Sequence, residues 1–203
     1  LSGTVNDFNN NGGSGLKIRS LGAVTLNNMQ AGNNTLYGLY VDNNFALALG
    51  GITLKGNNRF NNNGNSGLEA HSKGTILLNN LEANNNGQAH VAGNGYGVYL
   101  KNDFGALGIV TLTGYGNFNN NFETGLFISS RGNITLANIQ SHNNGHLDTS
   151  GGVGAWFSAG HGAYINNSSG TGNVTFTGDN GFTYNFRSGL EVYSSGAITV
   201  NNL

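Results

Sequence analysis

The chain has 203 residues, of which 8% are charged and 37% are hydrophobic, and its net charge at pH 7 is −1. This balance argues against a basic nucleic-acid-binding surface and against a polybasic membrane-surface patch. The absence of cysteine excludes disulfides, thiolate metal sites and cysteine nucleophiles. The most apolar run, Phe45–Ile52, is far shorter than the roughly 20 residues of a transmembrane helix, so no membrane insertion is expected.

A recurring unit is clearest between Gly67 and Gly87, where the sequence reads GLEAHSKGTILLNNLEANNNG. Two apolar segments with period-two alternation are followed by Asn-Asn, a single apolar residue and an Asn-rich corner. This pattern predicts three short β-strands separated by turns, which is typical of one rung of a parallel β-helix. The 35 glycines and the absence of proline fit tight corners between strands that pair on both sides.

The unit occurs in two alternating versions, and B-type rungs carry Tyr two residues after their opening glycine. A-type rungs open at Gly15, Gly67, Gly125 and Gly189, and B-type rungs open at Gly38, Gly97 and Gly162. Successive openings are 23, 29, 30, 28, 37 and 27 residues apart. We therefore predict an all-β fold, a parallel β-helix (β-solenoid) of about seven three-sided rungs, most of them 23–30 residues long.

Each predicted side forms a column of equivalent residues. The first side supplies inward pairs, from Leu16/Ile18 in the first rung to Leu190/Val192 in the last. The second side presents an outward threonine column broken at Leu77, and it consists of Thr25, Thr53, Thr111, Thr135, Thr175 and Thr199. One threonine per rung is narrower than the flat array expected of an ice-binding surface. We predict one inward anchor per rung on the third side: Phe8, Met29, Phe60, Leu81, Phe118, Ile139, Phe182 and Leu203.

Asparagine runs recur at two corners of the predicted rung. One corner holds Asn28, Asn80 and Asn202, and the other holds the runs at 10–11, 61–63, 84–86, 119–121 and 143–144. Asparagine tolerates left-handed backbone, and its amide can bond to an asparagine one rung away, so we expect side-chain ladders along the axis. Residues 1–203 are predicted to form a single segment. Because both termini fall within rungs, we expect it to be cut from a longer array.

The alternating modules GLxhxSxGxhTLNN and YGhYh…hTLxG, where h is apolar, resemble bacterial right-handed parallel β-helix repeat proteins of the cell surface. The architecture also resembles pectate lyases, but their catalytic motifs are absent. The resemblance implies a right-handed coil and a structural or adhesive extracellular rod, without catalysis or cofactor. Its implied partners are further solenoid segments, end to end or lateral, and cell-surface glycans. The alternative function is a carbohydrate-binding or polysaccharide-cleaving β-helix of the tailspike or pectate-lyase type.

The best candidate recognition surface is the outward column of the first side. It reads Lys17, Tyr40, Glu69, Tyr99, Phe127, Tyr164 and Glu191. Its four aromatic residues suit stacking on sugar faces or on another protein. The same column is also explained by packing between neighbouring rungs, and both interpretations stay open.

A long corner loop at 145–161 is the second candidate. It holds the only tryptophan, Trp156, followed by Phe157. Variable loops on a rigid solenoid are suited to recognition, although these rings could instead cover the core. No ligand spacing supports a metal site formed by His90, His146, Asp148 and His161. A catalytic acid pair is not expected either, because Glu69 and Glu191 lie four rungs apart, about 19 Å at ~4.8 Å per rung.

Overall fold

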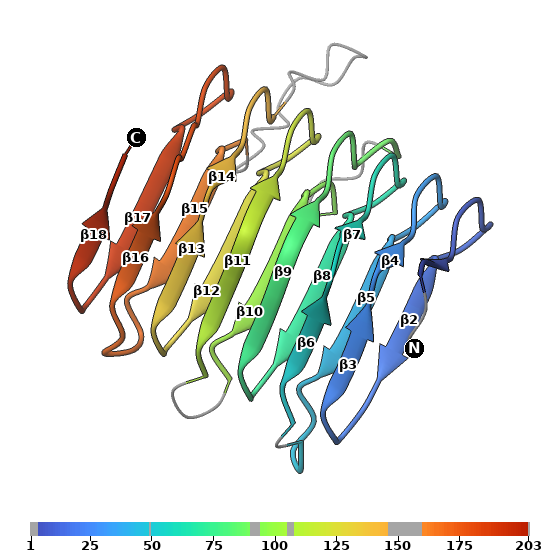
Figure 1. Cartoon of the computed structure of the whole chain (residues 1–203), viewed down its shortest axis with the longest axis horizontal. Coiled ribbons are helices and arrows are strands. Elements are labelled where there is room, and N and C mark those ends of the chain that lie inside the picture. The colour runs from blue at the N-terminus through green and yellow to red at the C-terminus, as the bar shows by residue number, and fades with distance from the viewer. Residues whose placement is uncertain (1–3, 49, 90–93, 105–107, 146–159, 203) are drawn as a thin grey trace, which may run out of the picture.

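A computed structural model describes residues 4–48, 50–89, 94–104, 108–145 and 160–202. This described part contains 18 β-strands and no helix. The strands form an 11-stranded sheet, here sheet A, and a seven-stranded sheet, here sheet B. Every assigned strand pair is parallel. Figure 1 shows the strands stacked in chain order from one end of the molecule to the other.

Sheet B contains the predicted first side of every rung. Its strands are β2 (Leu16–Arg19), β5 (Leu39–Asn43), β8 (Leu68–Ser72), β10 (Val98–Asn102), β12 (Leu126–Ser130), β15 (Ala163–Asn167) and β17 (Leu190–Ser194). The predicted inward pairs are in register across all seven strands. They are buried in the five inner strands and partly buried in β2 and β17, where they border the core.

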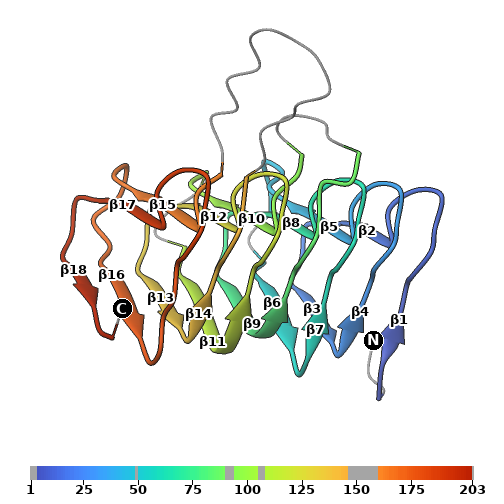
Figure 2. The same ribbon diagram turned by 90° about the horizontal axis from the view of Figure 1, so that it is seen from above.

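Sheet A combines the predicted second and third sides. The second side consists of β3 (Val24–Asn27), β6 (Ile52–Lys55), β9 (Ile76–Glu82), β11 (Val110–Asn117), β13 (Ile134–Ala137), β16 (Val174–Thr177) and β18 (Ile198–Val200). The third side adds β1 (Asn6–Asp7), β4 (Met29–Gln30), β7 (Asn58–Arg59) and β14 (Ile139–Gln140), while β9 and β11 extend into it. Seen from above, sheets A and B form separate layers that enclose the core (Figure 2). This all-parallel arrangement is consistent with a parallel β-helix.

The threonine column lies on the outer face of sheet A in one continuous register. Leu77 occupies the one non-threonine position, and 43% of its surface is exposed. The inward neighbours of the threonines in the inner strands, such as Val110 and Leu112, are fully buried, whereas Ile198 in the last strand is 47% exposed. The period-two alternation therefore separates a hydrophobic core face from a polar outer face.

The prediction of a single column of anchors on the third side is wrong. The aliphatic anchors and the phenylalanines lie in two separate columns, two residues apart along the chain. Met29 lies in register with Asn6 and Asn58, and Leu81 with Asn58 and Gly116. The phenylalanines stack instead on small residues, in the order Phe8, Ala31, Phe60, Ala83, Phe118, Ser141 and Phe182. Each large side chain is thus flanked by small or short polar ones, which fills a core of constant cross-section without overpacking. The anchor prediction for Leu203 lies outside the described residues.

An asparagine ladder runs along the next corner without interruption. In each step the Nδ2 of one asparagine donates to the Oδ1 of the next at 2.9–3.0 Å. The same Oδ1 also accepts the main-chain N–H of the preceding ladder residue at 2.9–3.1 Å. The members are Asn11, Asn34, Asn63, Asn86, Asn121, Asn144 and Asn185. These bonds satisfy polar groups that the corner would otherwise bury without partners.

The other corner, which contains Asn28, Asn80 and Asn202, is built differently. These three residues have left-handed backbone, but Gly56 and Gly114 take the equivalent positions in the intervening B rungs. A direct ladder between the asparagines is therefore interrupted at every second rung. Instead, the Oδ1 of Asn28 accepts the main-chain N–H of Asn57 at 3.0 Å.

Candidate functional site

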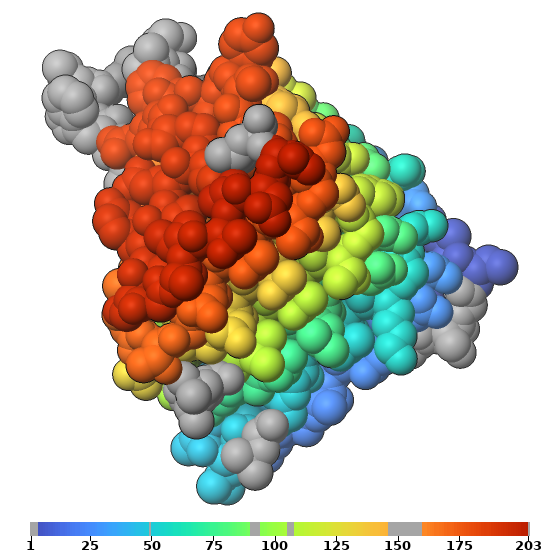
Figure 3. Space-filling model, turned by 60° about the vertical axis from the view of Figure 1, so that its left-hand side comes forward, coloured from blue at the N-terminus to red at the C-terminus, as the bar shows by residue number. Residues whose placement is uncertain are grey.

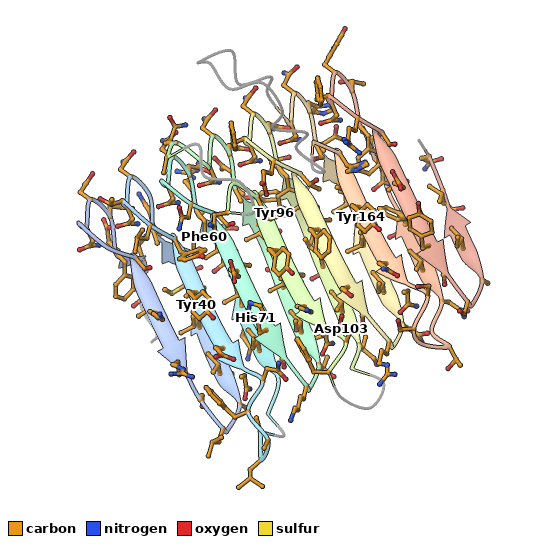
Figure 4. All side chains as sticks on the ribbon, turned by 180° about the vertical axis from the view of Figure 1, so that it is seen from behind. Tyr40, Phe60, His71, Tyr96, Asp103 and Tyr164 are labelled. Carbon is orange, nitrogen blue, oxygen red and sulfur yellow. The ribbon has the colours of Figure 1, made fainter. Side chains whose placement is uncertain are left out.

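The outward column of sheet B forms one continuous register from Lys17 to Glu191. Tyr40, Tyr99, Phe127 and Tyr164 are half-buried in it. Figure 4 views this face of the molecule, with Tyr40 and Tyr164 labelled. Because the strands are fixed in register by their backbone hydrogen bonds, these rings are held at one strand spacing from their neighbours.

Three of these rings stack on one another. The centroids of Tyr99 and Phe127 are 4.7 Å apart with their planes 7° from parallel, and Phe127 and Tyr164 are 5.3 Å apart at 5°. These distances are typical of offset stacking. Packing between neighbouring strands therefore accounts for part of the aromatic column, and only a part of each ring remains exposed to solvent.

A second row of rings precedes the opening glycines of the B rungs. Tyr37 lies 5.4 Å from Tyr40, Tyr96 lies 5.1 Å from Tyr99, and His161 lies 5.4 Å from Tyr164. This row was not predicted from the sequence, although a Tyr-Gly or His-Gly pair precedes every B rung. The row widens the column on one side.

Two more rings complete the surface on the other side. His71 lies between Tyr40 and Tyr99, 5.9 and 5.8 Å from their centroids, and Tyr193 lies 5.8 Å from Tyr164. We define the aromatic strip as Tyr37, Tyr40, His71, Tyr96, Tyr99, Phe127, His161, Tyr164 and Tyr193. It crosses the outer face of sheet B from β5 to β17 as one chain of ring contacts.

Two carboxylates lie in the outward column of the strip, each beside a histidine, and the buried Glu123 lies beside Tyr96. Glu69 lies in register between Tyr40 and Tyr99, and its Oε1 is 2.8 Å from His71 Nε2. The Oε2 of Glu191 is 3.2 Å from His161 Nδ1, at ion-pair distance but without an aligned hydrogen bond. In the described part of the chain neither carboxylate has a lysine or arginine at ion-pair distance.

The strip perturbs the titration of its own groups. The hydrogen bond that the Tyr193 hydroxyl donates at 2.6 Å is the main cause of the lowered pKa of Glu191. Burial lowers the pKa of His161. Burial also raises the pKa of Tyr37, Tyr40, Tyr96 and Tyr99, and the nearby charge of Glu69 raises each of them further. At neutral pH these four tyrosines are therefore protonated, and at the other end of the strip Tyr193 donates to an ionised Glu191.

Most of the second candidate, the 145–161 loop, lies outside the described residues. Trp156 and Phe157 lie outside the described residues, as do His90, His146 and Asp148. His161 belongs to the aromatic strip. In the described ranges no three His, Cys, Asp or Glu side chains are grouped so that they could hold a metal ion.

The remaining acidic side chains on this face have local partners. Asp42 pairs with Arg19 at 3.6 Å, and Asp103 accepts a hydrogen bond from Ser129 Oγ at 2.7 Å.

No helix among the described residues could cross a membrane. Comparisons of the chain with protein-family models, curated proteins and solved structures give no match.

Proposed function

We propose that this chain is part of an extracellular, non-catalytic β-solenoid rod that serves as a structural or adhesive element of a bacterial surface protein or filament. The observation that carries the proposal is the uninterrupted ladder from Asn11 to Asn185. Its hydrogen bonds run along the axis and join each coil to the next. A rod whose coils are all joined in this way resists bending and separation of its coils.

For the coil we propose right-handed winding with about seven three-sided rungs, because crossovers between parallel strands of one sheet are right-handed in about 98% of cases. Apolar side chains at both ends of the stack are suited to being covered by further coils. Leu16 and Ile18 at one end, and Phe182, Leu190 and Val192 at the other, are only partly buried against the core. Figure 3 shows the last coil at the front, at one end of the stack.

The test is electron microscopy of native material, with gold-labelled antibodies raised against this chain. We expect label along thin extracellular fibres whose diffraction shows an axial spacing of ~4.8 Å. Label confined to the cell interior would contradict the proposal. Short separate rods on the cell surface would favour an adhesive role over a filament.

Carbohydrate binding by the aromatic strip is the second candidate, and the nine-ring surface with its two carboxylates favours it. The apolar faces of sugars can pack against the exposed parts of these rings, and carboxylates and tyrosine hydroxyls can bond to sugar hydroxyls. Cleavage is not proposed. The separation of Glu69 and Glu191, four strand spacings or about 19 Å, exceeds the roughly 5–9.5 Å of a glycosidase acid pair.

A further inference from the structure

The surroundings of Glu69 are those of a cation-binding site. Its carboxylate lies between Tyr40 and Tyr99, with Tyr37 and Tyr96 beside these rings. Its ionic partner in the described chain is His71, whose Nε2 lies 2.8 Å from Glu69 Oε1. Among the described residues no lysine or arginine lies at ion-pair distance from this carboxylate, and aromatic rings like those around it attract cations.

A cation already lies on a ring of this column. The Nζ of Lys17, the outward residue of the first strand, is 5.0 Å from the centroid of Tyr40. On the same sheet, Lys101 Nζ is 4.6 Å from the centroid of Phe104. Ammonium groups are thus accommodated on the aromatic side chains of this face.

The arrangement around Glu69 is repeated at the far end of the strip. Glu191 occupies the same column four strands further on, with His161, Tyr164 and Tyr193 around it. Arg187 is close enough to influence Glu191 electrostatically, but it is not at ion-pair distance. Between the two carboxylates the column is uncharged and consists of Tyr99, Phe127 and Tyr164.

We propose that the aromatic strip binds a linear polysaccharide that carries amino groups, with Glu69 and Glu191 each pairing with an ammonium group. The sugars pack against the outward edges of Tyr99, Phe127 and Tyr164, because the faces of these rings stack on one another. A peptide strand is a poorer occupant, because β8 is already paired with β5 and β10 and offers no free backbone edge. The proposal rests on the second function given above, carbohydrate binding by the strip.

The test is calorimetric titration of the full chain with soluble glucosamine oligomers, compared with N-acetylglucosamine oligomers of equal length. We expect the glucosamine oligomers to bind at least tenfold more tightly, and added salt to reduce this difference. The double variant Glu69→Gln, Glu191→Gln should weaken their binding by about tenfold or more. Glu82→Gln is the matched control, because Glu82 pairs with Arg59 on the third side and its replacement should leave binding unchanged.

Each other outcome overturns a separate claim. Equal binding of both oligomers, unaffected by the double variant, would overturn the cationic ligand but keep carbohydrate binding. Binding of neither oligomer nor of uncharged glucans would overturn the inference and the carbohydrate function together. The rod proposal is decided separately by microscopy. Thermal unfolding of each variant checks that the isosteric glutamines have left the fold intact.

Discussion

The Oδ1 atom of Asn86 accepts two hydrogen bonds from Asn63, one from its Nδ2 and one from its main-chain N–H, both at 3.0 Å. Both residues are buried, with exposures of 1% or less. This doubled contact is the repeating unit of the ladder. It gives the corner an axial bond that does not depend on the two sheets.

Replacement of Asn86 by alanine should destabilise the protein by about 3 kcal/mol, because two buried donors of Asn63 lose their acceptor. Asn85→Gly in the same corner is the control. Asn85 has left-handed backbone that glycine adopts readily, so little change is expected. Thermal unfolding followed by circular dichroism measures both. Equal losses in the two variants would mean that the ladder is not the stabilising element.

The opening glycines should be equally sensitive. A Cβ on Gly67 would lie 2.6 Å from the carbonyl oxygen of Phe60 and 2.8 Å from Asn86 Nδ2. Gly67→Ala is therefore expected to cost about 1–3 kcal/mol. A Cβ on Gly13 meets nothing within 4 Å, so Gly13→Ala should leave the unfolding temperature unchanged. A neutral Gly67→Ala would show that the coil can widen at this corner.

The first two sides could be predicted because their signals are local. Gly67-Leu68 and the apolar-x-apolar triplets fix which residues point inward. The third side could not, because Asn58 points into the core. Its Nδ2 donates to the carbonyl oxygen of Asn79 at 2.8 Å, and a buried asparagine satisfied in this way looks like a turn residue in the sequence. Alignment of the rungs by their large side chains therefore placed Phe60 two positions out of register.

The candidate site could be predicted only in its central column. Tyr99, Phe127 and Tyr164 recur at a fixed distance from the opening glycines, and strand register alone brings them together. His71 and Tyr193 lie two residues further along their strands, and their contact with the column depends on side-chain direction. The pairing of Glu69 with His71 follows from that same geometry, whereas His161 reaches Glu191 from the residue before Gly162.

Replacement of Tyr184 should stabilise the folded protein. It has left-handed backbone, with φ of 57°, where the six equivalent residues are asparagines, and it is 86% exposed. Tyr184→Asn is expected to stabilise the protein by about 0.5–1 kcal/mol, because asparagine tolerates this conformation better. Tyr115→Asn, at a partly exposed position without positive φ, is the control and should give no gain.

Alkaline titration should reveal the buried tyrosines. Burial, followed by the charge of Glu123, raises the pKa of Tyr96 well above 10. A raised folded pKa contributes stability that is present below pH 10 and is lost as the pH rises through the folded value. Phenolate absorbance of the native protein should thus lag behind that of the denatured chain. In Tyr96→Phe the loss of stability at alkaline pH should be smaller, and an unchanged profile would contradict the assignment.

Acid should weaken the far end of the strip. Burial lowers the pKa of His161 below its ordinary value near 6.5, so its neutral form contributes stability that is present above pH 6.5. That stability is lost as the pH falls through the lowered folded pKa. Glu191, whose pKa is also lowered, loses its contribution at still lower pH, below about 4.5.

His161→Gln should flatten the pH dependence of the unfolding temperature between pH 7 and 5. His142→Gln is the control, because the His142 ring bonds to Thr183 and Gln140 outside the strip. If both variants flatten the profile equally, the acid sensitivity does not arise from the burial of His161.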